Sequence, residues 1–206
     1  MESDLRNLIH HIHVWARSHS CPFARIEEVV PKEGNILDFG CGHGAFSKFL
    51  KDQSPTRKVV GYDADERKIQ YAKKHFETNG LEYHLFHHQN GSLNGNPNCI
   101  IATDVFYLIP PEEQKKLLQS FYDLLPKGGQ IVIKEMDRRP WYKYHFNVLQ
   151  EFLMVRLFRL TFGHHFYFLK TDQFLQVLKE MGFEGSFMRI DRGNPYPHVV
   201  YVGLKV

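Results

Sequence analysis

The run from Ile36 to Phe46, ILDFGCGHGAF, constrains the fold of this chain more than any other stretch. An apolar strand pattern gives way to three glycines, Gly40, Gly42 and Gly44, and a helix pattern follows. Glycine lets the backbone take positive φ and approach a ligand more closely than a β-carbon would allow. The first amides of the helix have no partner within the helix and face the turn. The sequence therefore predicts a small polar ligand on a strand–turn–helix unit.

The glycines alone do not identify that ligand, because dinucleotide-binding turns are built in the same way. Gly40-x-Gly42-x-x-Ala45 satisfies the loose form of the dinucleotide pattern. Asp38, two residues before the first glycine, separates the alternatives: a carboxylate there repels a pyrophosphate and suits a ligand that carries positive charge. A ligand with an ammonium and a sulfonium group and no phosphate fits better. A tight strand–helix turn without any ligand is the remaining alternative.

The pattern Asp38-x-Gly40-x-Gly42-x-Gly44 resembles motif I of the class I S-adenosylmethionine (SAM)-dependent methyltransferases. This resemblance implies SAM as the cofactor and places Cys41, inside the turn, among the cofactor-binding residues. It extends from about residue 34 to the end of the chain. Within this range, only the glycine pattern and Asp63 are specific enough to indicate the family by themselves.

Strand and helix patterns alternate along the chain, which predicts an α/β fold with a Rossmann-like, doubly wound sheet of seven strands. The last two strands are joined by a short loop around Gly193-Asn194-Pro195, so we expect them to pair as an antiparallel hairpin. Such a closing hairpin resembles the class I methyltransferase fold and is not usual in dehydrogenases. Beyond the glycine turn, the expected strands are Lys58–Asp63, Leu81–His87, Cys99–Asp104, Gln130–Glu135, Gly185–Asp191 and His198–Leu204. The expected helices span residues 2–17, 22–30, 65–80, 111–125 and 171–181, and the segment 141–169 is expected to be mostly helical.

Polar residues follow several of the expected strands, where open α/β sheets bind their ligands. Asp63 ends the strand 58–63, and the resemblance implies that it binds the ribose hydroxyls of SAM, with Ala64 beside it. Its alternative role is to cap the next helix, but Asp65 is better placed for that. Asn90 is the candidate for the adenine amino group. Asp104 occupies the position of the family's fourth motif, near the methionine portion, and its alternative role is a helix cap.

Methyl transfer from SAM requires few catalytic groups on the protein, because the sulfonium is already a good leaving group. The rate is raised mainly by positioning the two reactants. A general base is needed only for an acceptor that arrives protonated. The candidates are His145, His164 and His165, and a surface or packing role is the alternative for each. The histidine pairs 87–88 and 164–165 lack the spacing and carboxylate of a metal site, so we expect no metal.

An aromatic segment, residues 141–168, lies between the fifth and sixth expected strands. Small-molecule methyltransferases have their substrate lid at that position, so we expect a lid over a large or apolar acceptor. A dimer interface, ordinary core packing and contact of its basic residues with an anionic membrane are alternatives. The candidate substrate residues are Glu135, Asp137, Trp141 and Tyr142.

Composition bounds the class of protein. The 206 residues fit one domain, which we expect to span 1–206 with a helical cap at 1–33 and the lid at 141–169. A net charge of +3 is too small to imply nucleic acid. Three scattered cysteines indicate neither disulfides nor a zinc ribbon. Because no signal-like or membrane-spanning run is present, we expect a cytoplasmic protein.

These observations predict a SAM-dependent methyltransferase that acts on a small aromatic or lipid-like acceptor. An RNA or tRNA methyltransferase is one alternative, although Thr103-Asp104-Val105-Phe106 lacks the Pro-Pro motif of enzymes that methylate base amines. A non-catalytic SAM-binding regulatory module is a second alternative, and an NAD-dependent oxidoreductase a third. The sequence leaves the acceptor atom and the oligomeric state open.

Overall fold

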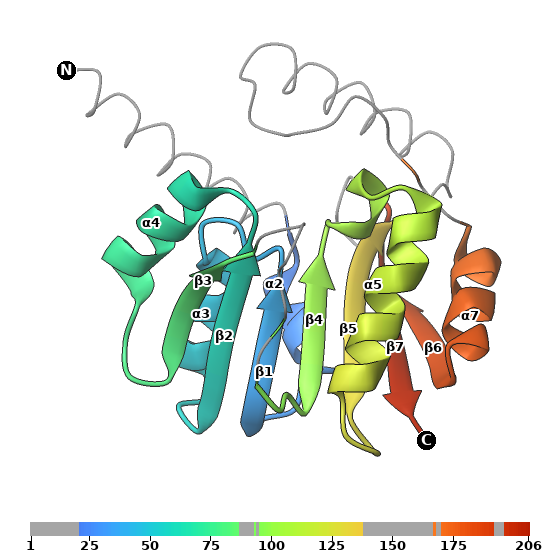
Figure 1. Cartoon of the computed structure of the whole chain (residues 1–206), viewed down its shortest axis with the longest axis horizontal. Coiled ribbons are helices and arrows are strands. Elements are labelled where there is room, and N and C mark those ends of the chain that lie inside the picture. Colours follow the sequence, from blue (N-terminus) through green and yellow to red (C-terminus); the bar gives the residue numbers. More distant parts are fainter. Residues whose placement is uncertain (1–20, 87–92, 94, 138–166, 168–169, 192–195) are drawn as a thin grey trace, which may run out of the picture. The chain divides into compact units, whose positions relative to one another are not determined.

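The computed structural model describes the chain except residues 1–20, 87–92, 94, 138–166, 168–169 and 192–195. In chain order the helices and strands are α2 (Phe23–Glu27), β1 (Gly34–Phe39), α3 (Ala45–Gln53), β2 (Arg57–Asp63), α4 (Glu66–Phe76), β3 (Leu81–Leu85), β4 (Cys99–Thr103), the 3₁₀ turn η1 (Phe106–Leu108), α5 (Pro111–Leu124), β5 (Gln130–Met136), α7 (Thr171–Glu180), β6 (Phe183–Arg189) and β7 (His198–Lys205). Along the described residues, helices alternate with strands except where β3 precedes β4 and β6 precedes β7 (Figure 1).

The strands form a seven-stranded sheet in the order β3-β2-β1-β4-β5-β7-β6. β1, β2 and β3 pair in parallel, whereas β7 pairs antiparallel with both β5 and β6. The Rossmann-like sheet and its antiparallel C-terminal hairpin are therefore confirmed. The hairpin folds back so that β7 lies between β5 and β6, an order that the loop length alone does not predict.

The chain divides into two compact units, residues 1–100 and 101–206. In the first unit, α3 and α4 pack against β2 and β3. Their apolar sides bury Phe46 and Leu50 of α3 and Ile69 of α4. The parallel register aligns Asp38 with Gly61 and Phe39 with Tyr62, so β1 and β2 end side by side. That alignment brings the glycine turn next to the end of β2.

The second unit packs α5 and α7 through aromatic rings. Phe106 lies 5.8 Å from Phe174 of α7 and 6.3 Å from Phe121 of α5 between ring centroids, both edge to face. α7 covers β6, where Gly185 leaves room for leucine side chains of the helix. β5 is buried along almost its whole length, with Ile131, Val132 and Ile133 fully enclosed. The carboxyl end of β5 thus lies in the buried core of this unit.

Helix α4 differs most from its predicted extent of 65–80. Asp65 caps its start by accepting the amide of Arg67 at 3.0 Å, but the helix ends at Phe76 because Glu77 takes an extended conformation. Gly80, with φ of +77°, lies in a separate turn closed by Thr78 and Leu81. The glycine therefore starts β3 instead of ending the helix.

Smaller differences concern element ends. α2 ends at Glu27, ahead of the expected residue 30, β3 stops at Leu85, and β6 begins two residues before Gly185. The expected helix 2–17, most of the aromatic segment 141–169 and the loop 193–195 lie outside the described residues. Among the helices that the structure describes, none has the length and apolar character needed to cross a membrane. The single-domain extent 1–206 stays a prediction.

Candidate functional site

The glycine turn joins β1 to α3 with three left-handed residues. Gly40, Gly42 and Gly44 have φ of +72°, +58° and +79°, values that side chains disfavour. The amides of Gly40 and Cys41 both donate to the carbonyl of Tyr62, at 2.7 and 2.9 Å, which fastens the turn to β2. Among the described residues, apart from its two chain neighbours, no heavy atom lies within 4 Å of the position that a β-carbon on Gly42 would take. The turn therefore offers open space for a ligand at Gly42.

Asp63 ends β2 beside this turn, and both of its carboxylate oxygens contact backbone amides. Oδ2 accepts the amide of Gly42 and Oδ1 the amide of Asp65, each at 2.8 Å. The side chain is only half-buried, and each carboxylate oxygen has a second lone pair. Asp63 is thus fixed in orientation and still able to accept hydroxyl groups from a ligand.

A buried polar layer supports the turn from within the first unit. Asp38 is fully buried and accepts the hydroxyl of Ser47 on α3 at 2.5 Å. Tyr83 of β3, also fully buried, donates to the carbonyl of Gly44 at 3.1 Å. A β-carbon on Gly44 would lie 2.6 Å from the Tyr83 oxygen, and one on Gly61 would lie 2.7 Å from its ring. Tyr83 therefore occupies the space that these two glycines leave.

Sequence reasoning did not single out Ser47 or Tyr83. Tyr83 looks like an ordinary inward residue of an alternating strand, and only its contact with the turn reveals its role. Burial raises the pKa of the Tyr83 hydroxyl far above its usual range, with further contributions from Cys41 and Asp38. The hydroxyl therefore stays protonated and can keep donating to Gly44.

The two other predicted residues of this region have simple environments. Cys41 is buried, and burial raises the pKa of its thiol, with smaller contributions from the charges of Asp38 and Asp63. The thiol is thus protonated and is not a nucleophile. Ala64 is exposed between Asp63 and the helix cap Asp65. The sequence argument that Asp65, and not Asp63, caps α4 is confirmed.

In the second unit, Asp104 directly follows β4. It has φ of +57° and is the one non-glycine residue with positive φ among those the structure describes. Its amide donates to the carbonyl of Lys134 at 2.9 Å, and its Oδ1 lies 2.6 Å from the Lys134 ammonium. The Lys134 side chain is 1% exposed. Sequence reasoning did not single out Lys134, although a charged residue inside the apolar strand QIVIKE is a signal that could have indicated this buried pair.

Glu135 lies next to that pair, near the end of β5, and is 7% exposed. Its Oε1 accepts the amides of Phe106 at 2.8 Å and Val105 at 3.1 Å. Burial first, and then the charge of Asp104, raise the pKa of the Glu135 carboxyl to about 8; the two amides and Lys134 oppose this rise. Its ionisation therefore falls close to neutral pH.

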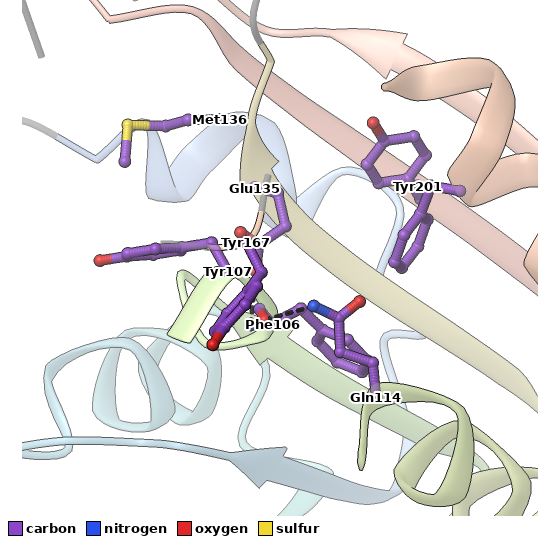
Figure 2. A pocket seen from close by; sticks show the side chains of 8 residues that line it. Phe106, Tyr107, Gln114, Glu135, Met136, Tyr167 and Tyr201 are labelled. Carbon is purple, nitrogen blue, oxygen red and sulfur yellow. Dashed lines mark hydrogen bonds between the residues drawn. The ribbon is translucent and has the colours of Figure 1, made fainter. Parts of the chain in front are cut away.

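Glu135 also lines a cavity of about 20 Å³ (Figure 2). In this view it lies between Tyr201 on one side and Tyr107 and Tyr167 on the other. Tyr167 is tied to Tyr107 by a backbone hydrogen bond of 2.7 Å. Gln114 donates to the carbonyls of Phe106 and Ile109 and so closes one wall. The remaining lining residues are Met136 and Phe174.

The other predicted site residues lie outside the described part of the chain. They are Asn90, Trp141, Tyr142, His145, His164 and His165, so their assignments stay predictions. Asp137 is described: it is 4% exposed and pairs with Arg189. Within the described ranges, no group of three or more His, Cys, Asp and Glu side chains is arranged to hold a metal ion.

Comparison with known proteins places this geometry in a family. A curated carboxy-SAM synthase from Mannheimia succiniciproducens is 25% identical over 125 residues, 54% of this chain and 48% of that protein. A trans-aconitate 2-methyltransferase from Variovorax paradoxus is 28% identical over 115 residues, 53% of this chain and 41% of that protein. The chain thus spans about half the length of the curated relatives it matches.

A solved structure shares the fold. Human N-acetylserotonin methyltransferase, determined in complex with SAM, superposes with a TM-score of 0.71 at 16% identity, covering 90% of this chain and 52% of that one. Residues 15–185 match the family described as "Methyltransferase domain", which is most of the chain. Together with the strand order and the glycine turn, this match is decisive: the chain belongs to the class I SAM-dependent methyltransferases.

Proposed function

We propose that this protein transfers the methyl group of SAM to a small-molecule acceptor. The observation that carries the proposal is the glycine turn, with three left-handed glycines and open space at Gly42 beside the fixed carboxylate of Asp63. A β-carbon at Gly42 would fill the space that a ligand needs. The residues present therefore fit a ligand that combines a ribose with a positively charged group.

Each residue of the turn has a defined part in this proposal. Asp63 accepts the two ribose hydroxyls through its free lone pairs, while its bonds to backbone amides keep it in place. Asp38, buried below the turn, supplies negative charge on the side of a cationic ligand. When bound, SAM supplies an electrophilic methyl group. The protein's contribution is then to hold and orient, which dominates the rate of such displacements.

The acceptor is proposed to be a small molecule, in keeping with the names of the trans-aconitate and N-acetylserotonin methyltransferases. A more specific aromatic or lipid-like acceptor rests on the composition of residues 141–168 alone.

The test is calorimetric titration with SAM, S-adenosylhomocysteine (SAH) and NAD. We expect binding of SAM and SAH in the micromolar range or tighter, and none of NAD. Asp63→Ala should weaken SAM binding by at least about tenfold, since two hydroxyl contacts to a charged group are lost. Asp65→Ala is the matched control, because it removes a neighbouring carboxylate that caps α4 and should leave SAM affinity within about twofold.

Other outcomes identify the alternatives. Binding of NAD without SAM would refute the proposal in favour of an oxidoreductase. Binding of SAM with no SAH formed from any acceptor would favour a regulatory module. Affinity for RNA that falls steeply with salt, together with methylation of that RNA, would replace the small molecule by a nucleic acid.

A further inference from the structure

Among the strands that the structure describes, β6 is the outermost at its end of the sheet. It stands last in the strand order and pairs with β7 (Figure 1). Six of its seven residues, Glu184–Arg189, are exposed. A strand in this position presents backbone amides and carbonyls to any strand that approaches its outer edge. The edge of β6 is therefore available for pairing.

The hydrogen-bond pattern shows which backbone groups of β6 point to that edge. One position beyond the β6–β7 register, the amide of Ile190 donates to the carbonyl of His198 at 3.1 Å. In an antiparallel pair, hydrogen-bonded residues alternate with residues whose backbone groups point the other way. The even-numbered residues of β6 therefore bond to β7. The amides and carbonyls of the odd-numbered residues, among them Gly185 and Phe187, point outward.

Exposed apolar side chains gather beside the same edge. Phe187 of β6 is 47% exposed. The other large apolar side chains that are exposed among the described residues are Met188, Leu204 and Val206. The edge strand at the other end of the sheet, β3, has five residues against seven in β6, and it exposes Glu82 and His84. Short polar edges prevent pairing between molecules, whereas an exposed apolar patch indicates an interface.

We propose that the outer edge of β6 binds β6 of a second copy of this chain. The two strands run antiparallel about a twofold axis that passes between their Ser186 residues, so that the two sheets form one continuous sheet. In this register Gly185 lies opposite Phe187 of the other copy, and Glu184 lies opposite Met188. Opposite residues then share a face of the sheet, as continuous pleating requires.

The charges of β6 favour a second copy in this orientation. Glu184 lies near the start of the strand, and Arg189, with a side chain 39% exposed beside Asp137, lies at its end. Antiparallel alignment brings the acidic end of each strand to the basic end of the other and puts no like charges directly opposite. Parallel alignment would put like ends together. The strand is therefore complementary in charge to itself.

The shape of the edge favours the same register. Gly185 has no side chain to block the ring of Phe187 from the other copy. Leu175 and Leu178 of α7 lie 3.3 and 3.5 Å from the position that a β-carbon on Gly185 would take. The exposed ring of each copy therefore meets an apolar surface of the other. Because the contact is twofold, it forms twice.

Cross-linking tests the register. Opposite residues that are not hydrogen-bonded have α-carbons about 4.5 Å apart, within the reach of a disulfide. Ser186→Cys should therefore give a disulfide-linked dimer in oxidised glutathione, seen on a non-reducing gel. Glu184→Cys is the matched control: it is exposed on the same face, but its counterpart lies about 13 Å away along the strands, and we expect cross-linking at least about tenfold slower. The native cysteines are buried and should not react.

Sedimentation of the full chain tests the contact itself. We expect a dimer at about 100 µM, and Phe187→Lys should raise its dissociation constant by at least about tenfold, since the ring is lost from the centre of the interface. His84→Lys, which adds the same charge to the edge strand β3, is the control and should change the constant by no more than about twofold.

Three results would overturn the inference. One is a wild type that stays monomeric, including a monomer whose Gly185 and Phe187 amides resist hydrogen exchange because another segment of the chain covers them. The second is a dimer that Phe187→Lys leaves intact. The third is cross-linking that is equally fast in Ser186→Cys and Glu184→Cys.

Discussion

Each unit of this protein buries a cation that pairs with a carboxylate, and the two pairs differ in how completely the surrounding backbone uses the cation's hydrogen-bond donors. Arg57, at the start of β2 in the first unit, is fully buried and lies 2.7 Å from Glu27. Its other donors bond to the carbonyls of Pro31, Leu50 and Val30 at 2.7 to 3.1 Å. All the polar atoms of this side chain are thus used by the fold.

Lys134 in the second unit is as deeply buried but forms a less closed arrangement. It pairs with Asp104, which has a left-handed backbone, and lies in sequence next to Glu135, whose pKa is raised to about 8. Strained backbone and perturbed titration are typical of functional sites. The Arg57 pair lies at the amino end of a strand and the Lys134 pair near the carboxyl end. The second pair, and not the first, therefore lies near the edge at which α/β sheets bind their ligands.

The largest effect is expected from breaking the Arg57 pair. Arg57→Met leaves Glu27 without its buried partner and three backbone carbonyls without their donor. We expect a loss of about 3–5 kcal/mol in the free energy of unfolding, measured by urea denaturation. Glu27 keeps its contact with Lys32 at 2.7 Å, so the loss should stay within this range.

A second substitution separates the charge from the packing. If the ion pair is purely structural, Arg57→Met combined with Glu27→Leu should recover part of the stability lost in the single variant, because no buried charge is left alone. A double variant less stable than the single one would show that Glu27 has another buried partner. Either protein that folds should bind SAM as the wild type does.

Removing Lys134 from the second pair should destabilise the protein less than Arg57→Met does, and it should shift the pKa of Glu135. Lys134→Met leaves Asp104 without the ammonium 2.6 Å away, but the Asp104 side chain is 12% exposed and can draw on water. We expect a loss of about 2–3 kcal/mol. Lys134 also lowers the pKa of Glu135, so that pKa should rise further in the variant. Carbon-13 NMR of labelled glutamate would follow it, and an unchanged pKa would contradict the coupling.

This contrast also shows what the sequence can and cannot predict. Alternating patterns and the glycine turn predicted the α/β sheet, its closing hairpin and the positions of Asp38 and Asp63, because periodicity and turn chemistry are local. The role of Tyr83 was not predicted, since it depends on contact with Gly44, 39 residues away. The strand order β5-β7-β6 likewise depends on pairing between distant segments. Glu135 was a candidate from its position, but its raised pKa depends on burial and on Asp104.

A smaller effect is expected from removing the charge of Asp104 while keeping its backbone. Asn tolerates the left-handed conformation better than other non-glycine residues, so Asp104→Asn should cost about 1–2 kcal/mol. Because the negative charge of Asp104 raises the pKa of Glu135, that pKa should fall, opposite in sign to the change in Lys134→Met. Asp104→Ala should cost about 1 kcal/mol more, as its side chain cannot support φ of +57°. Equal stability of the Asn and Ala variants would refute the strain at this position.

The smallest loss of stability is expected for an exposed ion pair, which serves as the reference for the two buried pairs. Lys48 and Asp52 lie one turn apart on α3, in contact and with side chains 35% and 54% exposed. Water screens this pair and both side chains lose rotational freedom on pairing, so Lys48→Gln should cost no more than about 0.5 kcal/mol. The cost should vanish in 1 M salt, where charges are screened within about 3 Å, while the losses in the Arg57 and Lys134 variants persist because their partners are buried. A salt-sensitive loss at Lys134 would show that its pair is open to solvent, and would place it with Lys48 instead of Arg57.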